Sequence, residues 1–171
     1  MVIKQKVGNR HSFDLANRSV DTIDLEWYET NKRIMHKRTR SGRDMVLKFL
    51  QQAPALTEGD VLWQDETSII AVEIKPCEAI ILQPATMQQM AAVCYEIGNK
   101  HLPLFFNNGE LLIPFEEPLF KLLSASGYEP KRESRKLLNA LKTTVLPHGG
   151  VETKQSLFSK ILQMTTSPAN V

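Results

Sequence analysis

The histidines are the side chains in this chain best suited to bind a transition metal. There are four, His11, His36, His101 and His148, and no two of them have HxH, HxxxH or HExxH spacing. A self-contained zinc site needs about four close ligands, so no local segment supplies a complete site. A two-fold dimer gathers ligands from distant segments, because every residue near its axis appears twice. We therefore expect a metal site at a subunit interface.

His101 is the strongest candidate ligand because of its place in the chain. It follows Ile97-Gly98-Asn99-Lys100, the expected end of a helix, and precedes Leu102-Pro103-Leu104, the expected start of a strand. Two copies of this imidazole facing each other would suit nickel, copper or zinc. His148, or water, would have to complete the coordination. The alternative interpretation is a histidine that complements the negative end of the helix dipole.

The other histidine and cysteine side chains are weaker candidates for metal ligands. Cys94 lies on an apolar stripe of the helix expected before His101, which is typical of a core residue. His36 lies in a basic segment, residues 32–43, that is expected to form a strand, and His36 is expected to face solvent. The sequence leaves the roles of Cys77 and His11 open.

The sequence carries no signature of catalysis and one strongly basic segment. It has no GxxxxGK[ST], GxGxxG or GxSxG motif, and we expect no enzyme activity. An RNA- or protein-docking module built on residues 32–43 is the alternative function. RNA is the weaker of these two partners, because no RNP-type aromatic stretch lies on the expected strands. The basic residues of this segment, which has no acidic residue, are Lys32, Arg33, Lys37, Arg38, Arg40 and Arg43.

The composition is typical of an ordinary globular protein. The chain has 171 residues, of which 42% are hydrophobic and 23% charged, and a formal net charge of +2. That charge is too small to indicate a nucleic-acid or membrane partner. No apolar run approaches the ~20 residues that span a bilayer. The two cysteines form no CxxC and the first residues form no signal-like apolar segment, so a reducing cytoplasm is the expected compartment.

The first half of the sequence predicts a β-rich domain over residues 1–75. Apolar residues alternate with polar ones in several short segments, which is typical of strands with one buried face. Turn signals such as Ser41-Gly42 and the segment 57–60 separate these segments. The alternating sets are Ile23, Leu25 and Trp27; Met45, Leu47 and Phe49; and Ile70, Val72 and Ile74.

The second half predicts the order strand, helix, strand, strand, helix, strand over residues 76–146. This is the ferredoxin-like (βαββαβ) arrangement, so the expected fold class is α+β. Thr86 and Gln89 fit a capping box, and Gly98 is expected to stop the first helix. Asn108-Gly109 predicts a hairpin turn, and Pro118 is expected at N1, the first position of the second helix. Residues 147–171 are expected to form a flexible tail.

The segment Cys94–Leu104 resembles the helix–GNxH–strand signature of the urease accessory protein UreE family. The amino half is also similar to that family at Asp24–Trp27, Leu56–Leu62 and Ile70–Val72. The likeness covers about residues 1 to 148, and the GNxH segment is its most specific part. The family usually has arginine where this chain has Lys100.

The resemblance implies a nickel metallochaperone that is a homodimer of a peptide-binding-like domain followed by a ferredoxin-like, metal-binding domain. The family's interfacial nickel ligand corresponds to His101, and a tail histidine of some relatives to His148. The implied cargo is Ni²⁺, and Zn²⁺ is expected to compete for the site. The implied partners are the urease accessory GTPase and, through it, the urease apoprotein complex. Many relatives have a histidine-rich tail that is not found here, which favours transfer of nickel over its storage.

Overall fold

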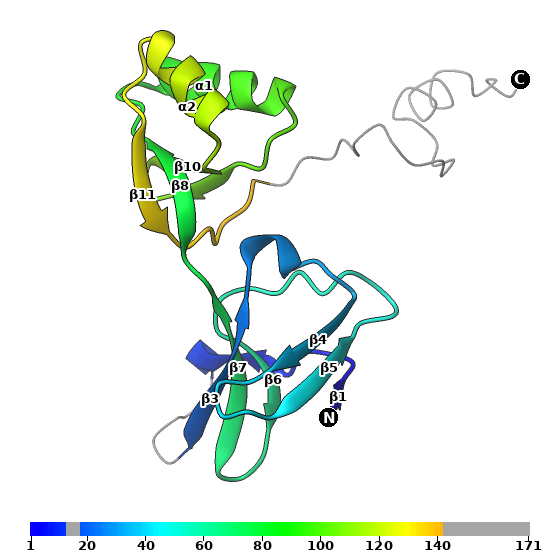
Figure 1. Cartoon of the computed structure of the whole chain (residues 1–171). Helices are drawn as coiled ribbons and strands as arrows, with labels where there is room; N and C mark the ends of the chain where they lie inside the picture. The colour runs from blue at the N-terminus through cyan, green and yellow to red at the C-terminus, as the bar shows by residue number, and fades with distance from the viewer. Residues whose placement is uncertain (13–17, 142–171) are drawn as a thin grey trace, which may run out of the picture. The chain divides into compact units, whose positions relative to one another are not determined.

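The computed structural model describes residues 1–12 and 18–141 (Figure 1). The described part of the N-terminal half contains two sheets and two short 3-10 helices, η1 (Arg10–Ser12) and η2 (Trp27–Glu29). One sheet has the order β1-β5-β4, with β1 at Val2–Ile3, β5 at Asp44–Lys48 and β4 at Ile34–Arg38. The other has the order β2-β6-β7-β3, with β2 at Gly8–Asn9, β6 at Asp60–Gln64, β7 at Ser68–Ile74 and β3 at Ser19–Leu25.

The apolar residues of both sheets form one core. Ile23 and Leu25 of β3, and Met45 and Leu47 of β5, are each at most 1% exposed. The predicted alternation is confirmed in β5, whose remaining residues are exposed or half-buried. It fails in β7, where four consecutive residues, Ile69–Val72, are buried, because this strand has neighbours on both edges and side chains packed on both faces.

The sequence pattern missed three strands of this half. β1 and β2 have two residues each, too few to show a period. β6 begins at Asp60, an acidic residue that reads as part of a turn, yet the Asp60 side chain is buried and accepts a hydrogen bond from the Thr57 N–H. A buried carboxylate with bonded partners is compatible with a strand, but the pattern of hydrophobicity cannot reveal it.

The C-terminal half has the predicted order of elements. They are β8 (Cys77–Leu82), α1 (Met87–Asn99), β9 (Phe105–Asn107), β10 (Glu110–Pro114), α2 (Glu117–Ala125) and β11 (Lys131–Arg135). Their strands form an antiparallel sheet of order β11-β8-β10-β9. The α+β fold class expected from the sequence is thus confirmed.

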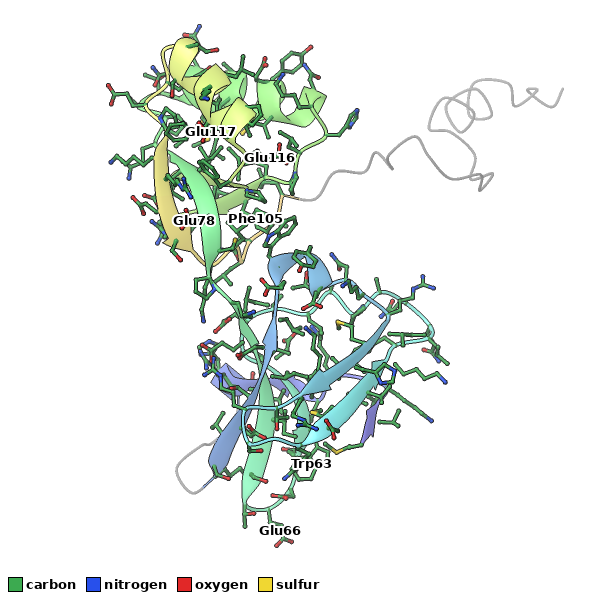
Figure 2. The ribbon with its side chains drawn as sticks, in the orientation of Figure 1. Trp63, Glu66, Glu78, Phe105, Glu116 and Glu117 are labelled. Atoms are coloured by element: carbon green, nitrogen blue, oxygen red, sulfur yellow. The ribbon has the colours of Figure 1, made fainter. Side chains whose placement is uncertain are left out.

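Side chains pack on both faces of this sheet, and β8 contributes buried residues to each face. Ile80 and Leu82 pack with residues of α1 and α2, whereas Ala79 and Ile81 pack with Phe105 on the opposite face. Figure 2 shows the labelled Phe105 on the side of the sheet away from the two helices. Burial on both faces explains why β8 reads as a continuous apolar run and not as an alternating one.

Local signals correctly placed the turns of this half. Asn108 (φ +48°) and Gly109 (φ +85°) form the two-residue turn between β9 and β10. This is the left-handed pair that a type I′ hairpin requires. Pro118 is the second residue of α2, one position later than predicted, because the helix begins at Glu117. Figure 2 labels Glu116 and Glu117 at the start of that helix, where acidic side chains favour the positive end of the dipole.

The start of α1 differs slightly from the predicted capping box. The Thr86 hydroxyl accepts a hydrogen bond from the Gln89 N–H at 3.1 Å, as expected. The Gln89 side chain, however, accepts from the Ala85 N–H at 2.8 Å, one residue before the capping position. Across the described ranges, neither helix has the length and apolar character needed to cross a membrane. The predicted tail, 147–171, lies outside the described residues, as does His148.

Candidate functional site

His101 lies at the C-terminal end of α1, in the turn that ends the helix. The helix runs to Asn99 and Lys100 is its C-cap. The His101 N–H donates to the Gly98 carbonyl at 3.0 Å, and the Leu102 N–H donates to the Ile97 carbonyl at 3.4 Å. These two bonds define a Schellman motif, with His101 at the position that follows the cap. The prediction that Gly98 stops the helix is therefore wrong, because Gly98 lies inside the last turn.

The backbone of His101 is in the left-handed region, with φ +54°. Glycine usually occupies this position because it has no Cβ to meet the neighbouring carbonyl. A residue with a Cβ costs about 1–2 kcal/mol more there. The Leu102 side chain, which packs in the same core cluster as Ile97, holds the chain in this turn. Glycine would adopt this conformation at a lower energetic cost than histidine. The presence of histidine here therefore indicates that its side chain has a role that offsets the strain.

We expect His101→Gly to stabilise the fold while removing the imidazole. Glycine relieves the left-handed strain, and its greater freedom in the unfolded chain offsets part of the gain. The expected increase is about 0.5–1 kcal/mol in the free energy of unfolding. His101→Ala keeps a Cβ and should show no such gain. Urea denaturation in the presence of a chelator measures both variants, and a glycine variant less stable than the alanine variant would contradict the argument.

The His101 side chain is exposed. Among residues 1–12 and 18–141 the imidazole forms no hydrogen bond or ion pair, and no cluster of three or more metal-binding side chains occurs. One described subunit thus offers a single free nitrogen ligand at this end of α1. That arrangement can bind a metal only together with ligands from elsewhere.

The face of α1 that leads to His101 is apolar and exposed. Met87 is 83% exposed and Tyr95 is 73% exposed, and Ala91 lies between them at helical spacing. Gly98 continues this face, and a Cβ built there would meet nothing within 4 Å. We call Met87, Ala91, Tyr95 and Gly98 the open face of α1. Only part of the apolar surface of α1 faces the sheet, since Val93 and Ile97 are the buried residues of the helix.

The remaining candidate ligands lie apart from this face or lack reactivity. Cys94 is half-buried against the helix–sheet core, and burial raises the pKa of its thiol. Burial also raises the pKa of Cys77, at the start of β8. Both cysteines therefore stay protonated more readily than an exposed thiol, which disfavours metal binding. His36 is exposed on β4, as predicted, and His11 is exposed in η1.

Part of the basic segment 32–43 is neutralised within the fold. Lys37 pairs with Glu29. Arg38 makes two hydrogen bonds to Asp44, at 2.8 and 3.1 Å, and Arg40 pairs with Asp24 at 3.0 Å. The sequence could not show these pairs, because the acidic partners lie outside the segment and on other elements. The segment therefore carries less uncompensated positive charge than its sequence indicates.

Sequence reasoning identified His101 but missed the open face of α1. The available signal was the width of the apolar arc. Nine of the 13 residues of α1 are apolar, small or sulfur-containing, and this arc is wider than one helix needs to cover a sheet. A second signal was Gly98, since glycine inside a helix costs about 1 kcal/mol relative to alanine and no described neighbour requires it.

Comparison with known proteins matches both halves of the chain to one family. The family model "UreE urease accessory protein, N-terminal domain" matches residues 3–75, and "UreE urease accessory protein, C-terminal domain" matches residues 75–140. The urease accessory protein UreE of Flavobacterium johnsoniae is 46% identical over 164 residues, which cover 96% of this chain and 99% of that protein.

Two further relatives give the same result. UreE of Helicobacter pylori (strain G27) is 39% identical over 164 residues, or 93% of this chain and 96% of that protein. UreE of Actinobacillus pleuropneumoniae is 39% identical over 145 residues, or 82% and 78%. The chain therefore belongs to the UreE urease accessory protein family, a family of accessory chaperones and not of enzymes.

Proposed function

We propose that this protein is a nickel carrier for the maturation of urease. Two subunits associate through the open face of α1, and the two His101 imidazoles bind one Ni²⁺ at the two-fold axis. His148, which lies outside the described residues, supplies a further ligand. The metal then passes to the urease accessory GTPase and, through it, to the urease apoprotein complex. The cytoplasm, where these partners and reduced cysteines are expected, is the proposed compartment.

The observation that carries this proposal is the place of His101 at the end of an unpartnered apolar helix face. Exposed apolar residues as large as Met87 and Tyr95 on one face indicate a contact with another protein surface. A symmetric dimer brings the same face of each subunit together. Each His101, three residues after Gly98, then meets its counterpart, and the pair provides the second nitrogen that one subunit lacks.

Two nitrogen ligands leave positions open around the metal. An incomplete coordination sphere lets a metal exchange, which a carrier requires and a structural site does not. Imidazole also suits Zn²⁺, so zinc should compete with nickel. Protons compete with the metal for the imidazole nitrogen, and nickel binding should therefore weaken as the pH falls.

Native mass spectrometry of the full chain, titrated with nickel, tests the proposal. We expect a dimer that takes up one nickel ion before any other species appears. Zinc added to the nickel-bound dimer should displace nickel without changing the oligomeric state. Nickel bound to monomers with the same affinity, or dimers that carry no nickel when the metal is in excess, would contradict the proposal.

A further inference from the structure

After β11 the chain crosses the sheet of the C-terminal half from one edge to the other. In that sheet β11 is one edge strand and β9 is the other. Leu137 is 2% exposed and packs with Phe105 of β9, which Figure 2 labels on the face away from the helices. Ala140 then forms an antiparallel bridge with Phe105. Leu137 thus anchors the crossing, and the chain after it runs along β9.

Two backbone hydrogen bonds fasten the last described residues to the outer edge of β9. The Phe106 N–H donates to the Asn139 carbonyl at 3.0 Å. The Leu141 N–H donates to the Leu104 carbonyl at 2.8 Å. These bonds lie on either side of the bridge, as in an antiparallel ladder. We call residues 139–141 the edge strap.

The edge strap is held by these bonds and not by buried side chains. All three of its residues are exposed, and Leu141 is 48% exposed. The preceding Leu138 is exposed as well. Segments with few buried contacts open at a lower free-energy cost than the core. The strap can therefore detach from β9 while Leu137 stays in place.

The edge strap ends beside the turn that contains His101. Leu104 is three residues after His101, and hydrogen-bonded strand partners lie about 5.5 Å apart, so Leu141 is within roughly 16 Å of His101. His148 follows Leu141 by seven residues, which extend to at most ~25 Å. The chain beyond Leu141 is therefore long enough to bring His148 to the His101 of its own subunit while the strap stays paired.

We propose that the edge strap positions the tail for nickel binding, and that Leu141 is a positioning residue that acts through its backbone N–H. This inference rests on the proposed function, which assigns a nickel ligand to His148. The paired strap fixes where the tail leaves the sheet. When the strap detaches, the tail begins four residues earlier, at Leu137, on the face away from the helices. A longer tether from a less favourable point lowers the effective concentration of its ligand.

Detachment of the strap also provides a route for release of the metal. Withdrawal of His148 leaves the two His101 ligands, and an incomplete coordination sphere favours exchange. Strap pairing and nickel binding are linked, so a strap that favours nickel binding is itself stabilised by nickel.

A purely protective role is the alternative. An exposed strand edge invites pairing with other chains, and a covering segment prevents this pairing. Detaching a strap that has this role alone would leave the nickel affinity unchanged, and nickel would leave the pairing of the strap unchanged.

Calorimetric titration of the full chain with nickel tests the proposal. Leu141→Pro removes the N–H that bonds to Leu104, and Leu141→Ala is the matched control because it keeps that N–H and shortens an exposed side chain. We expect Leu141→Pro to weaken nickel binding by about fivefold and Leu141→Ala by less than about twofold. In the His148→Ala background Leu141→Pro should have no further effect, since no tail ligand is left to position. Thermal denaturation verifies that each variant folds.

Hydrogen exchange of the Phe106 amide, followed by mass spectrometry, gives a readout on the strap itself. This amide is protected while the strap is paired, since its acceptor is the Asn139 carbonyl. By reciprocity, saturating nickel should slow its exchange by the same factor of about five. Nickel should not change its exchange in His148→Ala or in His101→Ala.

The outcomes separate this proposal from the proposed function. Unchanged nickel affinity in Leu141→Pro, together with a loss in His148→Ala, would overturn the role of the strap and leave the proposed function standing. An equal loss from Leu141→Pro with and without His148 would show that the strap does not act through the tail, and would overturn its role as well. Unchanged affinity in His148→Ala would remove the proposed ligand, and with it any role of the strap in nickel binding.

Discussion

Replacing His101 by alanine should lower the affinity of the dimer for nickel by about a thousandfold or more. Structural four-ligand zinc sites bind with about 10–16 kcal/mol, or roughly 3 kcal/mol per ligand. In the proposed dimer the substitution removes two imidazoles from a symmetric site at once, because the residue would appear in both subunits. A loss of about 5 kcal/mol corresponds to more than a thousandfold in the dissociation constant.

Isothermal titration calorimetry with nickel measures this effect. His36→Ala is the matched control, because it removes an equally exposed imidazole from β4, away from α1. It should leave both the affinity and the stoichiometry unchanged. His148→Ala should lower the affinity more modestly than His101→Ala, since the paired His101 side chains would still bind the metal. Unchanged affinity and stoichiometry in His101→Ala would eliminate the proposed site.

Substituting leucine for Gly98 should weaken dimerisation by about a hundredfold. The added side chain would occupy space that is open within the subunit, since a Cβ there meets nothing within 4 Å. Leucine is also a better helix former than glycine by close to 1 kcal/mol, so the subunit itself should not lose stability. In the proposed two-fold interface each subunit would add one leucine side chain. Overpacking typically costs about 1–3 kcal/mol at each such position.

Sedimentation equilibrium at several protein concentrations gives the dimer dissociation constant. Ser124→Leu is the control, because Ser124 is an exposed position of α2, the other helix of the same sheet face. It should leave the dimer intact. The dimer dissociation constant of Gly98→Ala should lie between those of the unmodified protein and of Gly98→Leu, since a methyl group adds less volume than the leucine side chain. A Gly98→Leu variant that dimerises like the unmodified protein would show that the open face of α1 is not the interface.

The sequence predicted those elements whose signal is local. The Asn108-Gly109 turn and the Thr86 cap each depend on a few adjacent residues, and both were found where expected. Pro118 lies one residue later in its helix than predicted. The order of strands and helices in the C-terminal half followed from these signals and from apolar periodicity. β1 and β2 were missed because a two-residue strand has no period, and its pairing depends on a partner more than forty residues away.

The chemical identity of the candidate site was determined by the sequence alone. A histidine after Gly98-Asn99-Lys100, flanked by a helix and a strand, is a feature of residue order, and no packing is needed to see it. What the tertiary structure decided is the setting of that histidine. The backbone bonds to Gly98 and Ile97 hold His101 in the left-handed region, and the docking of α1 on the sheet determines which apolar residues stay exposed.

The physical reason for this division is the range of the interactions involved. Caps, turns and helix periodicity are set by contacts between residues close in sequence, so their pattern can be read from the order of amino acids. Whether an apolar residue of α1 is core or surface depends on how many of them the sheet can cover. That number is fixed by β8 and β10, whose buried residues pack against Val93 and Ile97 and leave Met87 and Tyr95 exposed.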